Sequence, residues 1–183
     1  MIRGKQLNEL FNKMTPAQKN FCAMVIKENA SKFYSAPGGL YKHQNWEGGY
    51  HDHVVETMAI ATLLYQGLSQ YRPLPFTLAE SLYLIFIHDL EKMFILTISK
   101  NGKPIKIQTE IKGQSSFEKT MEMLDKYHLK LSKKHVNALK YCHGENEDYH
   151  PTKKIMNPLA AFIHCCDTIS ARIWYQYPKH KRS

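Results

Sequence analysis

At the centre of the sequence stands Phe86-Ile87-His88-Asp89-Leu90-Glu91-Lys92, and its interpretation decides the fold. An imidazole and a carboxylate follow directly on the apolar run that begins at Leu82. A carboxylate at the end of such a run is costly to desolvate unless something pairs with it. A divalent cation held jointly by His88 and Asp89 would offset that cost. A lone His-Asp pair is more often the polar end of a core helix, so the other His and Asp residues along the chain decide between these interpretations.

Apolar residues recur at helical spacing along most of the chain. The spacing predicts helices over about 16–32, 50–71, 77–88, 115–127 and 157–173, with a shorter helix after Ser132. Asn101-Gly102 lies between the β-prone segments 94–98 and 105–109, which is a strong hairpin signal. We therefore predict an all-α fold, a compact helical bundle with one small β-hairpin insert at about 93–109.

Length and composition indicate one ordinary globular domain. The chain has 183 residues, of which 43% are hydrophobic and 22% charged. We predict a single domain over 1–178, followed by a basic tail over 179–183. The formal net charge of +9 suits phosphate-bearing partners, but about half of the excess sits at the two ends of the chain, so it is weak evidence for nucleic acid.

The four cysteines form no Cys-x-x-Cys pair, which favours reduced thiols. The N-terminus leads into no apolar signal core, and no apolar run approaches the length that spans a bilayer. We therefore expect a soluble, cytoplasmic protein with no membrane partner.

The residues of chemical interest are expected at the ends of the predicted helices: His53, His88, Asp89, His143 and Asp167. Two imidazoles and two carboxylates can coordinate a divalent metal and leave positions open for water and substrate. Such ligands suit Mn, Fe, Co, Ni or Zn better than Ca, and Mg is an alternative. No Ser, Thr or Cys nucleophile machinery and no Gly-rich phosphate loop is visible in the sequence. A metal-bound water is therefore the natural nucleophile.

The order His53, His88-Asp89, Asp167 resembles the HD-domain superfamily of metal-dependent phosphohydrolases. The resemblance covers about 33–172. The pair Gly48-Gly49, placed before His53, is similar to a subgroup that includes YhaM-type exoribonucleases and phage-encoded HD proteins. The resemblance implies a helical fold around one metal centre with His53, His88, Asp89 and Asp167 as ligands. For a phage-encoded protein, the compartment would be the host cytoplasm.

The sequence departs from the family pattern at three places. No His occurs over 112–119, where two-metal members often carry one, and Cys142 takes the place of a second His, with His143 next to it. We therefore predict one metal rather than two. Glu91 stands where the family commonly has Gly, so an extra carboxylate faces either the metal or solvent.

We assign catalytic roles to Asp89, which would orient the attacking water, to Lys92 as a phosphate contact, and to His143 as a pocket residue or proton donor. Further substrate contacts are expected from four residues: His43, Trp46, Lys92 and Arg172. Each of these side chains also suits an ordinary structural role, such as a solvated cation or a packed ring.

The leading hypothesis is a metal-dependent phosphohydrolase that cleaves a phosphate ester or anhydride of a nucleotide or another phosphorylated small molecule. The alternative is a phosphodiesterase or nuclease on single-stranded RNA or DNA, with nucleic acid as the partner. A third hypothesis is a nucleotide-binding module without turnover. HD proteins often self-associate, so a homo-oligomer is compatible with each hypothesis.

Overall fold

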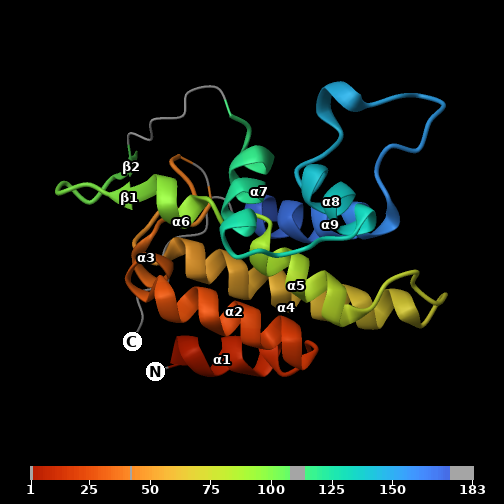
Figure 1. Ribbon diagram of the computed structural model, residues 1–183, viewed down its shortest axis with the longest axis horizontal. Coiled ribbons are helices and arrows are strands. Elements are labelled where there is room, and N and C mark those ends of the chain that lie inside the picture. The colour runs from red at the N-terminus through yellow and green to blue at the C-terminus, as the bar shows by residue number, and fades with distance from the viewer. Residues whose placement is uncertain (1, 42, 108–113, 174–183) are drawn as a thin grey trace.

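The computed structural model describes residues 2–41, 43–107 and 114–173 (Figure 1). The helices and strands follow in this order: α1 (Ile2–Phe11), α2 (Pro16–Glu28), α3 (Ala30–Ser35), α4 (Gly49–Ser69), α5 (Leu78–Ile87), α6 (Lys92–Ile95), β1 (Leu96–Ile98), β2 (Pro104–Lys106), α7 (Ser116–Lys126), α8 (Lys133–Lys140), the 3-10 helix η1 (Asn146–Asp148) and α9 (Pro158–Ile173). The chain is mostly helical and carries one two-stranded antiparallel sheet, which confirms the predicted fold class.

Helix α4 lies at the centre of the bundle. It packs against α9 on one side and α5 on another, and α1 and α3 also contact it. Figure 1 shows α4 and α5 running side by side through the middle of the molecule, with α1 and α2 below them. This arrangement brings the N-terminal end of α4, the C-terminal end of α5 and the middle of α9 to one place. Asp167 therefore lies inside its helix, and the expectation that it falls at a helix end was wrong.

Local sequence explains where several helices begin. Three helices start with a capping box, in which a hydroxyl and a side chain three residues later satisfy each other's backbone N–H groups. The pairs are Thr15 with Gln18 (α2), Thr77 with Glu80 (α5) and Ser115 with Glu118 (α7). The box of Thr77 and Glu80 fixes the start of α5, and the length of that helix then determines where His88 and Asp89 lie.

The core continues without a break into the polar stretch. Every residue from Ser81 to Ile87 is buried, and His88 and Asp89 are 2% and 0% exposed. The ring of Phe86 packs against those of Phe11 and Phe33. The two polar residues therefore lie in the interior rather than on a helix end that meets water.

The predicted hairpin exists, but it is shorter than the sequence indicates. Residues 92–95 form α6, because the amides of Phe94 and Ile95 bond back to the carbonyl of Glu91. Strand β1 then pairs with β2 in the register Leu96↔Lys106, Thr97↔Ile105 and Ile98↔Pro104. The expected strand residues 108–109 and the predicted tail 179–183 lie outside the described residues.

Two further helical features differ from expectation. The predicted helix over 16–32 is divided at Asn29, whose backbone N–H bonds to the carbonyls of Val25 and Ile26 and closes α2. Helix α1 was not predicted, and its Leu7, Leu10 and the following Phe11 enter the core. No helix among residues 2–41, 43–107 and 114–173 is long and apolar enough to cross a membrane.

Candidate metal centre

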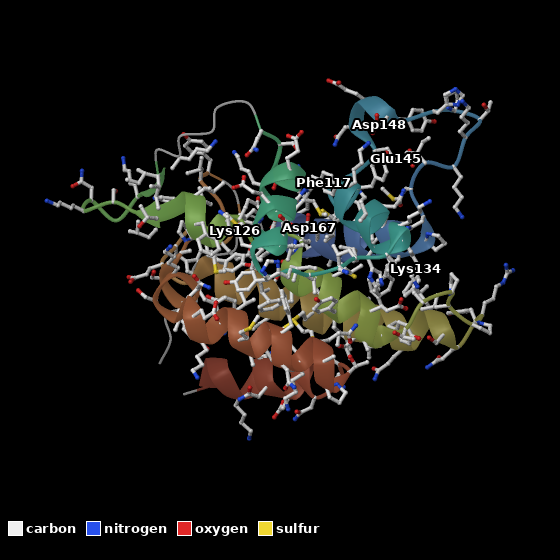
Figure 2. All side chains as sticks on the ribbon, viewed as in Figure 1. Phe117, Lys126, Lys134, Glu145, Asp148 and Asp167 are labelled. Carbon is white, nitrogen blue, oxygen red and sulfur yellow. The ribbon has the colours of Figure 1, made fainter. Side chains whose placement is uncertain are left out.

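Four residues that could hold a metal ion meet in the interior: His53 from α4, His88 and Asp89 from the end of α5, and Asp167 from α9. One ligand atom from each lies within 4.8 Å of the others, and all four residues are buried. Figure 2 shows Asp167 in the middle of the molecule, well away from the loop and 3-10 helix that carry Glu145 and Asp148. The structure thus brings together the four residues that the sequence singled out as ligands.

The separations between these atoms suit donors that share one ion. His53 Nε2 lies 3.2 Å from Asp167 Oδ1 and 3.5 Å from Asp89 Oδ2. His88 Nε2 lies 3.2 Å from Asp89 Oδ2 and 3.7 Å from Asp167 Oδ1. Donor atoms about 2.0–2.2 Å from a common ion are themselves roughly 3–4 Å apart.

The ring of His88 is held in one orientation. Its Nδ1 lies 2.6 Å from the carbonyl oxygen of Ile85, which can only accept a hydrogen bond, so Nδ1 carries a hydrogen. The other nitrogen, Nε2, therefore points at the carboxylates. A metal-binding histidine is oriented in the same way, through a hydrogen bond from its second nitrogen.

Several buried atoms at the centre have no hydrogen-bond partner in the described part of the chain. Among them are His53 Nε2, His88 Nε2 and Asp167 Oδ1. Buried polar atoms without partners are rare in folded proteins because desolvation is costly. A cation among them would satisfy all three at once, so the residues present fit a divalent metal.

Interactions between the charged side chains of the cluster shift their pKa values strongly. Burial disfavours the His88 imidazolium, but Asp89 and Asp167 outweigh burial and hold the pKa of His88 well above its ordinary value. Burial likewise disfavours the carboxylate of Asp89, but His88 and Lys92 hold its pKa well below the usual range. The pKa of Asp167 is also lowered, by His53 and His88 against burial. These side chains among themselves form a network of buried opposite charges, so a cation would compete with protons for the carboxylates and the ring nitrogens.

Lys92 and His143, both assigned catalytic roles from sequence, contact Asp89. Lys92 Nζ lies 2.5 Å from Asp89 Oδ2, and this ion pair raises the pKa of Lys92 although burial opposes it. His143 Nε2 lies 3.2 Å from Asp89 Oδ1. Burial opposes the His143 imidazolium, but Asp89 prevails and raises the pKa of His143 to about 11. With 39% of its side chain exposed, His143 stands between the buried centre and solvent.

The three other predicted substrate contacts have different surroundings. The ring centroid of His43 lies 5.1 Å from that of His53, and burial together with His53 and Lys92 lowers the pKa of His43 to about 4. Trp46 is half-buried and donates its indole N–H to Asp52 Oδ2 at 2.9 Å. Arg172 is exposed on α9. Within the described residues, neither Trp46 nor Arg172 forms a hydrogen bond or ion pair with the four ligands.

Glu91 faces neither the metal position nor solvent. It is 2% exposed, and its carboxylate accepts hydrogen bonds from Ser116 Oγ and, at 2.8 Å, from Thr120 Oγ1. Burial and the nearby Asp89 raise the pKa of Glu91. The extra carboxylate therefore anchors α7 to the turn that carries the ligands.

The structure also describes the two places where the sequence lacks the additional histidines of two-metal family members, Cys142 and part of the segment 112–119. Cys142 is buried, and its thiol donates to the carbonyl of Leu139 at 3.1 Å, while its sulfur lies 3.6 Å from His143 Nδ1. In the other segment, 112–119, only 114–119 is described, and it contains no histidine.

Sequence reasoning missed three polar residues behind His53: Gln44, Glu56 and Ser170. Glu56 follows His53 by three residues on α4, and Ser170 follows Asp167 by three on α9, so each shares a helix face with a ligand. That spacing in the sequence could have identified Glu56 and Ser170.

Comparison with protein-family models, with curated proteins and with solved structures found no match.

Proposed function

We propose that this chain is an HD-type, metal-dependent phosphohydrolase that cleaves a phosphate ester or anhydride of a nucleotide. The observation that carries the proposal is the convergence of His53, His88, Asp89 and Asp167 in a buried cluster with unpartnered donor atoms. A structural ion would need no flanking cation, yet Lys92 and His143 stand beside this cluster.

The chemistry of the four donor side chains restricts which metal ions the site suits. Two imidazole nitrogens and two carboxylates suit Mn, Fe, Co, Ni or Zn, whereas Ca prefers a shell made entirely of oxygen. Mg is the alternative among hard cations. We propose one ion for each chain.

Lys92, His143 and His43, which flank the cluster, would each have a separate role in the reaction. A bound divalent ion supplies Lewis acidity and lowers the pKa of water. Lys92 is positioned to neutralise charge that develops on the phosphoryl oxygens. His143 reaches both Asp89 and solvent, so its imidazolium can give a proton to the leaving oxygen and recover one from bulk water. The lowered pKa of His43 keeps its ring neutral at pH 7, so it can donate or accept a hydrogen bond but brings no positive charge to the substrate.

A nuclease or phosphodiesterase is the second candidate, and the hairpin favours it. Lys100, Lys103 and Lys106 are all exposed, and residues 96–107 contain no acidic side chain. Figure 1 shows the hairpin projecting from the body of the molecule directly after α6. A basic arm that is joined by α6 to the turn carrying His88 and Asp89 could hold the phosphate backbone of a longer substrate.

The deciding experiment is a substrate panel in Mn²⁺, Co²⁺ or Mg²⁺. Nucleoside mono-, di- and triphosphates, cyclic dinucleotides and short oligonucleotides are each incubated with the purified protein. Phosphate release from mononucleotides is expected, and shortening of oligonucleotides would favour the second candidate instead. Tight binding without turnover under every metal would identify a binding module and overturn the proposal.

A matched pair of variants assigns the activity to this site. Asp89→Ala should abolish both metal binding and turnover, because it removes a ligand that also contacts Lys92 and His143. Asp125→Ala changes an exposed aspartate on α7 and should leave both intact. Full activity in Asp89→Ala would show that another site does the chemistry.

A further inference from the structure

A second group of polar side chains lies directly behind His53, on the side away from the carboxylates. It consists of Gln44 from the loop before α4, Glu56 from α4 and Ser170 from α9. Ser170 is 0% exposed and Gln44 is 4% exposed. Two buried polar side chains beside a half-buried carboxylate, Glu56, require an explanation, because burying polar groups stabilises the fold only when they are well paired.

The contacts within this group converge on one hydroxyl. Ser170 Oγ lies 3.2 Å from His53 Nδ1. The Gln44 amide nitrogen lies 3.3 Å from the same hydroxyl and 3.2 Å from Glu56 Oε2, so it bridges the two. Burial raises the pKa of Glu56, and hydrogen bonds from Ser170 and Gln44 oppose that rise.

The backbone before α4 is shaped to bring Gln44 to this position. Gln44 has a φ of 42°, which side-chain-bearing residues rarely adopt, and its carbonyl accepts the Gly38 N–H at 2.8 Å. A Cβ on Gly49 would lie 1.8 Å from that carbonyl oxygen. The absence of a side chain on Gly49, the second glycine of the pair before His53, therefore leaves the space that the backbone of Gln44 occupies.

The direction of the hydrogen bonds follows from what each group can donate. Ser170 has one hydroxyl hydrogen, and Gln44 already donates to its oxygen. An ionised carboxylate is a stronger acceptor than a ring nitrogen, so the hydroxyl hydrogen of Ser170 points to Glu56. Ser170 Oγ then presents a lone pair to His53, whose Nδ1 must donate.

We propose that Ser170, backed by Glu56 and Gln44, is a positioning residue that keeps the ring hydrogen of His53 on Nδ1 and leaves Nε2 free to bind a cation. His53 lacks the backbone carbonyl that does this for His88, so the polar group takes its place. The inference rests on the metal site of the proposed function, but not on the reaction.

The first test is Co²⁺ affinity, measured by titration of the visible absorption of the bound ion. Ser170→Ala removes the acceptor for Nδ1 and should weaken binding by about 10- to 100-fold. Glu56→Gln keeps the shape of the side chain but removes its charge, so we expect a smaller loss in the same direction. The matched control is Ser81→Ala, another fully buried serine, whose hydroxyl donates to the Leu78 carbonyl away from the site.

The second test separates positioning from mere packing. In the Co²⁺-loaded protein, ring N–H protons of bound histidines give strongly shifted, exchangeable NMR signals. In Ser170→Ala the His53 signal should exchange with solvent faster, whereas the His88 signal, protected by the Ile85 carbonyl, should stay unchanged. Equal acceleration of both signals would indicate general loosening and overturn the proposal.

Equal Co²⁺ affinities of wild type, Ser170→Ala and Glu56→Gln would also overturn it. If Ser170→Ala does not fold, Glu56→Gln decides by the same two measurements. Should wild type bind no Co²⁺ at all, the proposed function fails, and ¹⁵N ring shifts of the metal-free protein then test the positioning role alone. In that case, a hydrogen on His53 Nδ1 that is present in wild type and lost in Ser170→Ala supports the positioning role of Ser170. Identical spectra of the two proteins refute it.

Discussion

The Nε2 atom of His53 lies 3.2 Å from Oδ1 of Asp167, and neither atom has a hydrogen-bond partner among the described residues. The two residues come from α4 and α9, which pack against each other. A cation shared by them would therefore tie together two helices of the core. Because only the folded chain brings these ligands together, metal binding should stabilise folding.

This coupling predicts a metal-dependent melting temperature. At a free-metal concentration 100 times the Kd, the folded state gains about 2.7 kcal/mol. For a domain of this size, that corresponds to an increase of roughly 5–10 °C in Tm. Differential scanning calorimetry with and without Mn²⁺ or Co²⁺, followed by chelation with EDTA, measures the increase and its reversal.

Asp167→Asn should remove most of that increase, because an amide is a far poorer ligand than a carboxylate. Asp125→Asn, on the exposed face of α7, serves as the control and should respond to metal as wild type does. An equal rise in Tm for both variants would mean that the stabilising ion binds elsewhere.

Lys92→Ala should separate metal binding from turnover. Lys92 Nζ is 2.5 Å from Asp89 Oδ2, so its positive charge repels a cation at the cluster. Without it, metal affinity should stay equal or rise, whereas kcat should fall roughly 100-fold through loss of charge stabilisation in the transition state. Metal titration and steady-state kinetics on the same preparation measure both. Loss of metal binding would instead make Lys92 a structural partner of Asp89.

Glu91 provides a prediction about stability. Glu91→Ala leaves the hydroxyls of Ser116 and Thr120 without their acceptor and should cost about 1–3 kcal/mol in the free energy of unfolding. Hydrogen exchange should accelerate in α7 more than in α4. Urea unfolding gives the free energy, and Glu122→Ala, which breaks an exposed ion pair with Lys126, is expected to cost well under 1 kcal/mol. Similar losses in the two variants would contradict an anchoring role for Glu91.

Much of the fold was predictable because its signals are local. Hydroxyl caps at Thr15, Thr77 and Ser132, helical periodicity, and Asn101-Gly102 placed most elements correctly. The division at Asn29 and the turn of α6 were not predictable, because each depends on backbone hydrogen bonds that short apolar runs do not specify.

The sequence predicted which residues form the buried His/Asp cluster, but not which side chains surround it. Spacing and residue type indicated His53, His88, Asp89 and Asp167, and the structure brings them together. The Glu91 side chain points towards α7 because the hydroxyls of Ser116 and Thr120 donate hydrogen bonds to its carboxylate. These two residues lie far from Glu91 in the sequence, so no local pattern reveals the contact. Contacts of that kind arise only from tertiary packing.

The glycine pair before His53 supports a prediction with a built-in comparison. In Gly49→Ala the new Cβ would meet the Gln44 carbonyl oxygen at 1.8 Å, so the backbone must shift. We expect a loss of about 1–3 kcal/mol in unfolding free energy, together with weaker metal binding. Gly67 lies on the same helix, α4, but a Cβ there would have no atom within 4 Å. Because alanine favours a helix more than glycine does, Gly67→Ala should raise the free energy of unfolding by up to about 1 kcal/mol. Chemical denaturation of both variants tests this, and a stable Gly49→Ala protein with unchanged metal affinity would contradict it.

A last prediction concerns acid stability and the contact between α5 and α8. Glu80 Oε1 lies 2.6 Å from Lys134 Nζ and 3.3 Å from His135 Nε2. Burial alone would raise the pKa of Glu80, but hydrogen bonds from Lys134 and the Thr77 backbone prevail and lower it from 4.5 to about 2. The folded state therefore binds this proton less readily than the unfolded chain. The stabilising contribution is complete above about pH 4.5 and is lost as the pH falls towards 2.

Glu80→Gln isolates this contribution because glutamine still supports the capping box, as Gln18 does in α2. The difference in unfolding free energy between wild type and variant should be constant above pH 5 and should shrink steadily between pH 4.5 and 2. In a Lys134→Gln background the same substitution should have a smaller effect, since the main partner is already gone. A difference that does not vary with pH would show that the loss in Glu80→Gln comes from packing rather than from the charge of Glu80.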